Sequence, residues 1–299
     1  MTGTTNTTGL ARVVDAMQRD DVDVLLLGRE ANARFVTGAA RLFLAGERAF
    51  SPGCVVVRAT EAAHLLAVGD FGVPREQLYP ISWNPATVMA EIAAIPGVAG
   101  ARRVGVDGLT PLFEGLIASH LGSPELVDGE RILRAARRIK TPDEIGAIRA
   151  AVAVARTVMR AALEAARHAA PDRTIVAVAM EAMARDGTTT ASFEPVITRD
   201  ADVTAIDIGV LRGGWEGGLA RTEPPVPLPA EHEQAVARCI AGTRVDDIAP
   251  SGRVHGVGLG YEVLEPGSEL APNMVLSVTN GLVRDIVLVT DGEPDVLTR

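Results

Sequence analysis

The chain has 299 residues, an apolar fraction of 47%, a charged fraction of 22% and a formal net charge of −9. This length allows two domains of ordinary size, and the composition can supply a sizeable hydrophobic core. The acidic balance argues against nucleic acid or an anionic membrane as a partner, because both attract clustered Lys and Arg. No apolar run approaches the roughly 20 residues that span a bilayer, so we expect no membrane partner.

Cysteine usage and the first residues bear on the cellular compartment. Cys54 and Cys239 are far apart and form no CxxC motif, which is typical of free thiols in a reducing compartment. The opening MTGTTNTTGL lacks the basic and apolar regions of a secretory signal peptide. Both observations favour a cytoplasmic protein.

Strand and helix patterns alternate in the first 137 residues. Between Val22 and Val57 the pattern predicts strands joined by turns, with VDVLLLG and CVVVRA as buried strands and HLLAVG continuing the series. The later segments ATVMAEIAAI and PLFEGLIASHL carry apolar residues at helical spacing. This alternation predicts an α/β domain over residues 1–137.

The second half, residues 138–299, opens with the strongest helix signal in the chain. Thr141 is a good N-cap, Pro142 suits the first helical position, and Glu144 completes a capping box. A second helix is predicted at TIVAVAMEAMARDG, which ends at Gly187. The segments VTAIDIGV and MVLSVTNGLVRDIVLVT predict strands.

Among the five histidines, one has a setting that favours a functional role. His255 stands in VHGVGLGYE, where glycines let the backbone approach closely and expose the ring. We expect His64 and His120 to be structural, and His168 and His232 to be solvated. Outside the histidines, Asp207 ends an apolar strand, where a buried carboxylate requires a partner.

Several segments, in order, resemble the creatinase/aminopeptidase P group, which also holds Xaa-Pro dipeptidases and methionine aminopeptidases. They are VDVLLLGREANARFVTG, RRIKTPDEIGAIRAAVAVA, IDIGVLRGGWEGGLART, HGVGLGYE and the two final strands. The resemblance implies an α/β (α+β) protein with a creatinase-like N-terminal domain over 1–137. A pita-bread C-terminal domain with shortened loops would follow over 138–299. It also implies a homodimer in which one chain's N-terminal domain borders the other's cleft.

In the metalloenzymes of this group, two Asp, one His and two Glu hold two metal ions. Asp207 and His255 match two of these positions, whereas Gly218, Thr279 and Arg284 occupy the other three. Divalent metals require several O or N donors, and the guanidinium charge is effectively permanent. The sequence therefore predicts no bound metal and no other cofactor.

The leading functional interpretation is a metal-independent, creatinase-like hydrolase that acts on a C–N bond of a small polar substrate. His255 would be its general acid/base, and Asp207 would orient the ring and favour its cationic form. The glycines Gly217 and Gly218 would leave space for the substrate. Four charged residues are candidates for substrate binding: Glu216, Glu262, Arg221 and Arg284. Each has a plainer alternative, as a surface Glu or as an Arg paired with an Asp such as Asp285.

Two other interpretations stay open. One is a non-catalytic pita-bread protein that keeps its cleft for a ligand or partner. The other is an Xaa-Pro-type metallopeptidase whose ligands are replaced by neighbours such as Asp285 or Glu216. The segments before Asp207, before His255 and after Thr279 are short for the group. Either the protein is naturally trimmed there, or loops are missing from the sequence, and a catalytic His could lie in such a loop.

Overall fold

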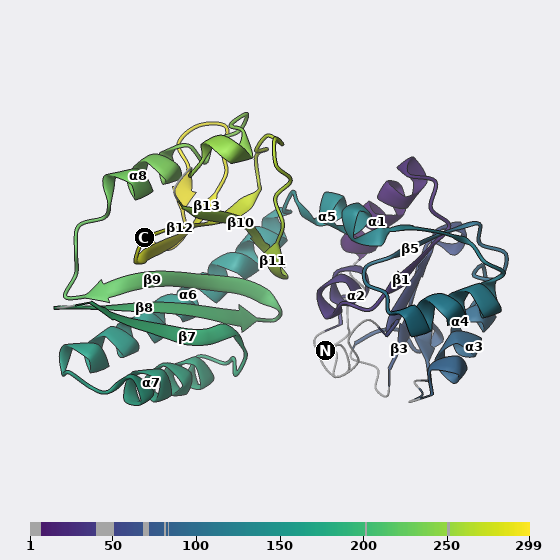
Figure 1. Ribbon diagram of the computed structural model, residues 1–299, viewed down its shortest axis with the longest axis horizontal. Coiled ribbons are helices and arrows are strands. Elements are labelled where there is room, and N and C mark those ends of the chain that lie inside the picture. The colour runs from purple at the N-terminus through teal and green to yellow at the C-terminus, as the bar shows by residue number, and fades with distance from the viewer. Residues whose placement is uncertain are drawn as a thin grey trace. The chain divides into compact units, whose positions relative to one another are not determined.

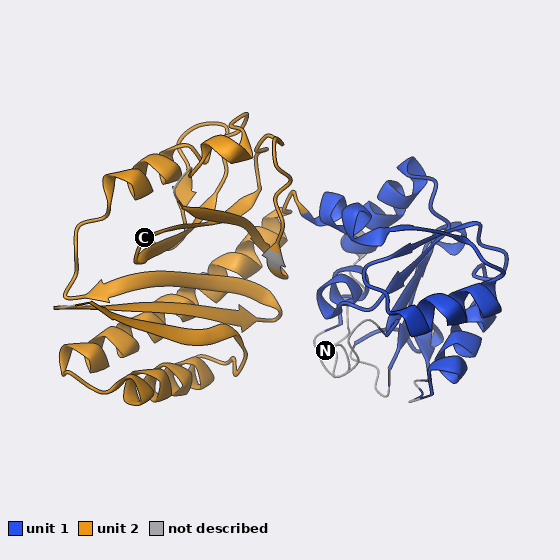
Figure 2. Ribbon diagram, in the orientation of Figure 1, with its two compact units in different colours: residues 1–137 blue, residues 138–299 orange. Residues whose placement is uncertain are grey.

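The computed structural model describes residues 7–39, 51–67, 72–80, 82, 84–200, 202–249 and 252–299. The chain divides into two compact units, residues 1–137 and 138–299 (Figure 2). Among the described residues, no helix is both long enough and apolar enough to cross a membrane.

The described part of the first unit is a sheet covered by helices (Figure 1). The strands lie in the order β4-β3-β2-β1-β5-β6, in which β1 is antiparallel to β2 and parallel to β5. They span β1 (Val24–Leu27), β2 (Cys54–Val57), β3 (Ala62–Leu66), β4 (Leu78–Tyr79), β5 (Arg103–Val106) and β6 (Glu125–Asp128). The helices are α1 (Thr7–Arg19), α2 (Glu30–Thr37), α3 (Pro85–Ala94), α4 (Pro111–Leu121) and α5 (Gly129–Arg137), with short 3₁₀ turns at Arg58–Thr60 and Arg75–Gln77. The predicted α/β class is confirmed.

Helix α2 corrects the prediction of strands and turns between Val22 and Val57; residues 40–50 of that stretch lie outside the described ranges. The carboxylate of Asp107 accepts hydrogen bonds from the backbone N–H groups of Gly28 and Arg29, which precede the helix. It also accepts one from the side chain of Asn32 at 2.7 Å. Asp107, which is far along the chain, thus accepts hydrogen bonds from the residues at the start of α2. Analysis of short-range sequence patterns could not detect this contact.

The second unit begins with the predicted capped helix, α6 (Pro142–Arg167). The Thr141 hydroxyl accepts from the backbone N–H of Glu144, and the Glu144 carboxylate accepts from the backbone N–H of Thr141, so the capping box is confirmed. Helix α7 (Asp172–Arg185) follows and packs on α6.

Eight strands form the second sheet, in the order β11-β10-β12-β13-β9-β8-β7, with β14 beside β13. They span β7 (Ala191–Asp200), β8 (Val203–Arg212), β9 (Trp215–Glu223), β10 (Arg253–Gly258), β11 (Gly260–Glu262), β12 (Val275–Asn280), β13 (Val283–Leu288) and β14 (Asp295–Val296). Helix α8 (Ala230–Ala237) and a 3₁₀ turn at Val245–Asp247 connect β9 to β10. Each pair among these strands is antiparallel.

Helix α6 packs against one face of β8 and β9, where Ile206, Ile208 and Leu219 join its apolar stripe in one core. Gly217 lies on this face, and a Cβ there would stand 2.3 Å from the backbone carbon of Ala151 in α6. The expectation that Gly217 leaves space for a substrate is therefore wrong, because its missing side chain allows the helix to approach the strand.

Candidate active site

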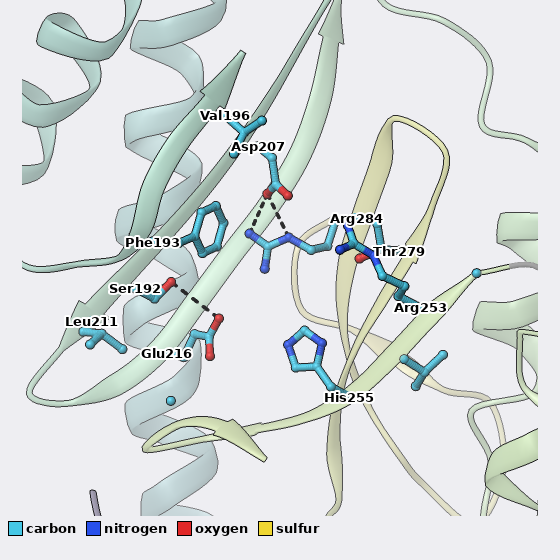
Figure 3. Close-up of a pocket in the computed structure, with 13 residues that line it drawn as sticks. Ser192, Phe193, Val196, Asp207, Leu211, Glu216, Arg253, His255, Thr279 and Arg284 are labelled. Atoms are coloured by element: carbon cyan, nitrogen blue, oxygen red, sulfur yellow. Dashed lines mark hydrogen bonds and ion pairs between the residues drawn. The ribbon is translucent and has the colours of Figure 1, made fainter. Parts of the chain in front are cut away.

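A cavity of about 750 Å³ lies on the face of the second sheet opposite to α6. Side chains from β7, β8, β9, β10, β12 and β13 reach it, so segments distant in sequence form one pocket (Figure 3). Four of the six residues predicted for the site line it: Asp207, Glu216, His255 and Arg284. The cavity is therefore the place where the chemistry predicted from the sequence would occur.

Asp207 on β8 and Arg284 on β13 form an ion pair across the intervening strand β9. Both residues pair in register with Ala220 of β9, whose small side chain lets the two charged groups meet. Nε and Nη2 of Arg284 lie 2.9 Å and 2.7 Å from the same oxygen, Oδ1 of Asp207. The Arg284 side chain is only 4% exposed, against 26% for Asp207. A partly exposed carboxylate thus pairs with a buried side chain whose positive charge is permanent.

Two further contacts fix the guanidinium of Arg284. Nη2 donates to the carbonyl oxygen of Ile208 at 2.8 Å. The Phe193 ring lies with its centroid 5.0 Å from Cζ, within the range of a cation–π contact (Figure 3). The plainer alternative, pairing of Arg284 with Asp285, is wrong for this residue, since its carboxylate partner is Asp207.

His255, half-buried on β10, extends into the cavity. Burial, which is the largest cause, and the positive charges of Arg284 and Arg253 together lower its pKa to about 4. The imidazole is therefore neutral near pH 7. The sequence predicts that Asp207 favours the cationic form. That expectation is wrong, because the charge of Asp207 is taken up by Arg284.

Glu216, which is 4% exposed, comes from β9 on the other side of the cavity (Figure 3). Burial raises the pKa of its carboxyl, Arg284 opposes this rise, and the carboxylates of Asp207 and Glu262 add to it. The hydroxyl of Ser192 donates to Oε1 over a long 3.5 Å. Glu216 is thus a carboxyl group whose surroundings favour retention of its proton.

Glu262 and Arg221, the remaining predicted residues, are engaged away from the cavity lining. Glu262 forms a buried ion pair with Lys140, with Nζ 2.7 Å from Oε2. Arg221 bonds Oδ1 of Asp285 through Nη2 at 2.5 Å, and Nη1 donates to the carbonyl oxygens of Ala220 and Arg284. The plainer interpretation of Arg221, an Arg paired with an Asp, is what the structure shows.

Asp285 is fully buried on the opposite face of β13 from Arg284. Its carboxylate accepts from Thr298 and from the terminal Arg299 as well as from Arg221, and His232 lies 2.9 Å from Oδ2. Burial alone would raise the Asp285 pKa, but the hydrogen bond from His232 and the charge of Arg221 outweigh it and hold the pKa far below its usual range. His232 is fully buried, so the expectation that it is solvated is wrong.

The donor set does not fit the dinuclear metal centre of the resembled metalloenzymes. Among the described residues, no group of three or more His, Cys, Asp or Glu side chains could hold a metal ion. Both oxygens of Asp285 point away from the cavity into its own network, so it does not replace a ligand. The guanidinium of Arg284 already pairs with one oxygen of Asp207, Oδ1.

Arg253, Ser192 and Phe193 are among the residues of the cavity lining that sequence analysis missed. Arg253 stands two positions before His255 on one strand, so the period of two in β-strands would have placed both on one face. Ser192 and Phe193 belong to β7, where two register shifts relative to β8 interrupt the alternation. The sequence of a single chain carries no signal that identifies such a bulge.

Comparison with known proteins gives the family context of this geometry. Residues 10–139 match the family model "Creatinase/Prolidase N-terminal domain". The prolidase of Pyrococcus furiosus superposes with a TM-score of 0.74 at 18% identity, covering 97% of this chain and 99% of that one. The Xaa-Pro dipeptidase of Bacillus anthracis gives 0.75 at 18% identity, covering 98% of each chain.

A third similar structure is a His350Ala form of aminopeptidase P from Escherichia coli, with a TM-score of 0.72, 14% identity, and coverage of 98% of this chain and 94% of that one. No curated protein sequence matches the chain significantly. The match to the N-terminal model and the shared fold confirm the predicted resemblance and the two-part fold class.

Proposed function

We propose that the protein is a hydrolase, because residues 10–139 match the creatinase/prolidase N-terminal model and the chain shares its fold with prolidases. Prolidases and Xaa-Pro dipeptidases, by their names, cleave a C–N bond. We propose that this protein cleaves the same type of bond in a small polar substrate, and that it does so without a dinuclear metal centre. The observation that carries the proposal is a neutral imidazole and a carboxyl of raised pKa on opposite sides of one cavity.

His255 supplies the base. Since its pKa is lowered to about 4, the imidazole is neutral at pH 7, and its unprotonated nitrogen can accept a proton from water. The water oxygen bonds to the carbon of the scissile C–N bond while its proton passes to His255. General base catalysis of this kind contributes about 10²–10⁴-fold to the rate.

Glu216 supplies the acid. Its pKa is raised, so the carboxyl group retains its proton to a higher pH than an ordinary glutamic acid does, and the departing nitrogen takes that proton as the C–N bond breaks. Two titratable groups can divide the acid and base roles in this way when the surroundings of one lower its pKa and those of the other raise its pKa. His255 then returns its proton to solvent, and Glu216 is reprotonated.

Arg284 supplies positive charge where the attacked group gains negative charge. Its guanidinium is held by Asp207, Ile208 and Phe193, so it is preorganised before the substrate binds. Arg253 is exposed at the cavity and offers a second cation to an anionic part of the substrate.

The test is hydrolysis of a panel of small amides, dipeptides and amidines by the wild type and by His255→Ala and Glu216→Gln. We expect release of amine by the wild type and a loss of about 10²–10⁴-fold in kcat for His255→Ala. The matched control is His168→Ala, an exposed imidazole paired with Glu164 on α6. Equal kcat values for His255→Ala and the wild type would contradict the proposal.

The competing candidate is an Xaa-Pro-type metallopeptidase with substituted ligands, which the prolidase fold favours. Of the two proposed substitutes, Asp285 is committed to its own network, whereas Glu216 does line the cavity. Dipeptide cleavage by the wild type that a chelator abolishes and Mn²⁺ restores would favour this candidate. The non-catalytic alternative predicts no turnover of any member of the panel, together with ligand binding that His255→Ala weakens.

A further inference from the structure

We propose that Arg284 is a resident cation of this site: its guanidinium holds Asp207, takes the position that a divalent ion would need, and requires glycine at position 218. The proposal concerns the charge and space in the cavity, and it holds whether or not the protein hydrolyses a substrate. Three observations carry it.

The first is the row formed by Arg284, Ala220 and Asp207 on neighbouring strands. Two nitrogens of Arg284 converge on one oxygen of Asp207, at 2.9 Å and 2.7 Å, although a bidentate pair would use both oxygens. Oδ1 of Asp207 therefore faces one cation, the guanidinium, much as a carboxylate oxygen would face a single metal ion. A metal ion at this oxygen would have to displace a buried guanidinium that cannot lose its charge.

The second observation is the contact at Gly218. A Cβ at this position would lie 2.5 Å from Nη2 and 2.7 Å from Nη1 of Arg284, closer than such atoms can approach. It would also lie 2.7 Å from the carbonyl oxygen of Ile208, which itself accepts from Nη2. Any side chain at position 218 therefore competes with the guanidinium for the same space.

The third observation is the set of donors around the guanidinium. Asp207 and His255 line the cavity together with Arg284, and they are two of the side-chain types that divalent metals use. Among the described residues no three such side chains are grouped so that they could hold an ion, and the guanidinium of Arg284 stands beside the Asp207 carboxylate. Changing Arg284 to a carboxylate should reverse the charge there and add a donor beside Asp207.

The first experiment is therefore Arg284→Glu, titrated with MnCl₂ and ZnCl₂ in a calorimeter. We expect affinity for at least one of the two ions to rise by about tenfold or more over the wild type. The matched control is Arg253→Glu, which makes the same change of charge in the same cavity without touching the ion pair with Asp207. We expect this control to bind metal no better than the wild type.

Two results would overturn the proposal. One is stoichiometric Mn²⁺ or Zn²⁺ binding by the wild type that Asp207→Asn abolishes. The other is a folded Arg284→Glu protein, with native circular dichroism, that binds neither ion better than Arg253→Glu does. Neither readout depends on enzymatic activity, so failure here is distinct from failure of the proposed hydrolase function.

A second experiment tests the coupling and decides the matter if Arg284→Glu does not fold. Gly218→Ala is introduced into the wild type and into Arg284→Ala, and the four proteins are unfolded in urea. We expect Gly218→Ala to be less destabilising in the Arg284→Ala background, since the contact with the Ile208 carbonyl is common to both. Equal destabilisation in the two backgrounds would overturn the coupling.

Discussion

Arg284 and Asp285 are consecutive residues of β13 that belong to two separate charge networks, because a β-strand directs successive side chains to opposite faces. Arg284 bonds Asp207 at the cavity, whereas Asp285 is fully buried and paired with Arg221, Arg299 and His232 on the other side. The strand therefore separates a candidate catalytic surface from a structural centre.

Asp285→Asn should be strongly destabilising. Removing the charge leaves two partly exposed arginines without their shared carboxylate, and breaking ion pairs of a fully buried carboxylate costs about 3–5 kcal/mol. Urea unfolding measures this loss. The control Asp295→Asn removes a half-exposed carboxylate paired with Arg149, and should cost about 1 kcal/mol or less. Similar losses for both variants would contradict a structural role for Asp285.

Acid should destabilise the protein through the same residue. The pKa of Asp285 is far below its usual value in the folded state, so its contribution is complete above the unfolded-state pKa of about 3.9 and declines as pH falls below that value. We expect the free energy of unfolding to fall as pH decreases from about 4 to about 2 in the wild type, and to fall less in Asp285→Asn. Parallel pH dependence in the two proteins would argue against this assignment.

The pH dependence of kcat/KM should report the two proposed catalytic residues. His255 must be neutral, so activity should rise as pH increases through about 4. Glu216 must be protonated, so activity should fall at a pH above the ordinary range of a glutamic acid. In Glu216→Gln the falling limb should disappear from the residual activity. Its persistence in that variant would assign the limb to another group.

Glu262 should prove structural and not substrate-binding. Its partner Lys140 has a side chain only 1% exposed, and Glu262→Gln would leave that ammonium without its carboxylate. We expect a loss of about 3–5 kcal/mol in the free energy of unfolding. Glu265→Gln, an exposed neighbour, serves as the control. A stable Glu262→Gln protein with a raised KM would instead support the substrate role predicted from the sequence.

On the family resemblance alone, we propose that the protein is a homodimer. Sedimentation velocity at micromolar concentration should give a species of about twice the chain mass of 31.3 kDa. A single species at the monomer mass across the concentration range would contradict it.

Local sequence determined much of the framework. The capping box at Thr141 and Glu144 and the apolar stripe after it specify α6, since both depend on residues within a few positions of one another. The short apolar runs specify the buried strands for the same reason. The glycine setting of His255 and the strand-end position of Asp207 were sufficient to select two residues of the cavity.

Tertiary structure decided what those residues are able to do. The protonation of His255 depends on burial and on Arg284 and Arg253, and the guanidinium of Arg284 comes from a different strand. Likewise, only the register of β13 with β9 and of β9 with β8 brings Arg284 to Asp207, and so separates Arg284 from its sequence neighbour Asp285. Charge pairing and desolvation act through space, so residues 77 positions apart set each other's chemistry where the linear pattern carries no record of their contact.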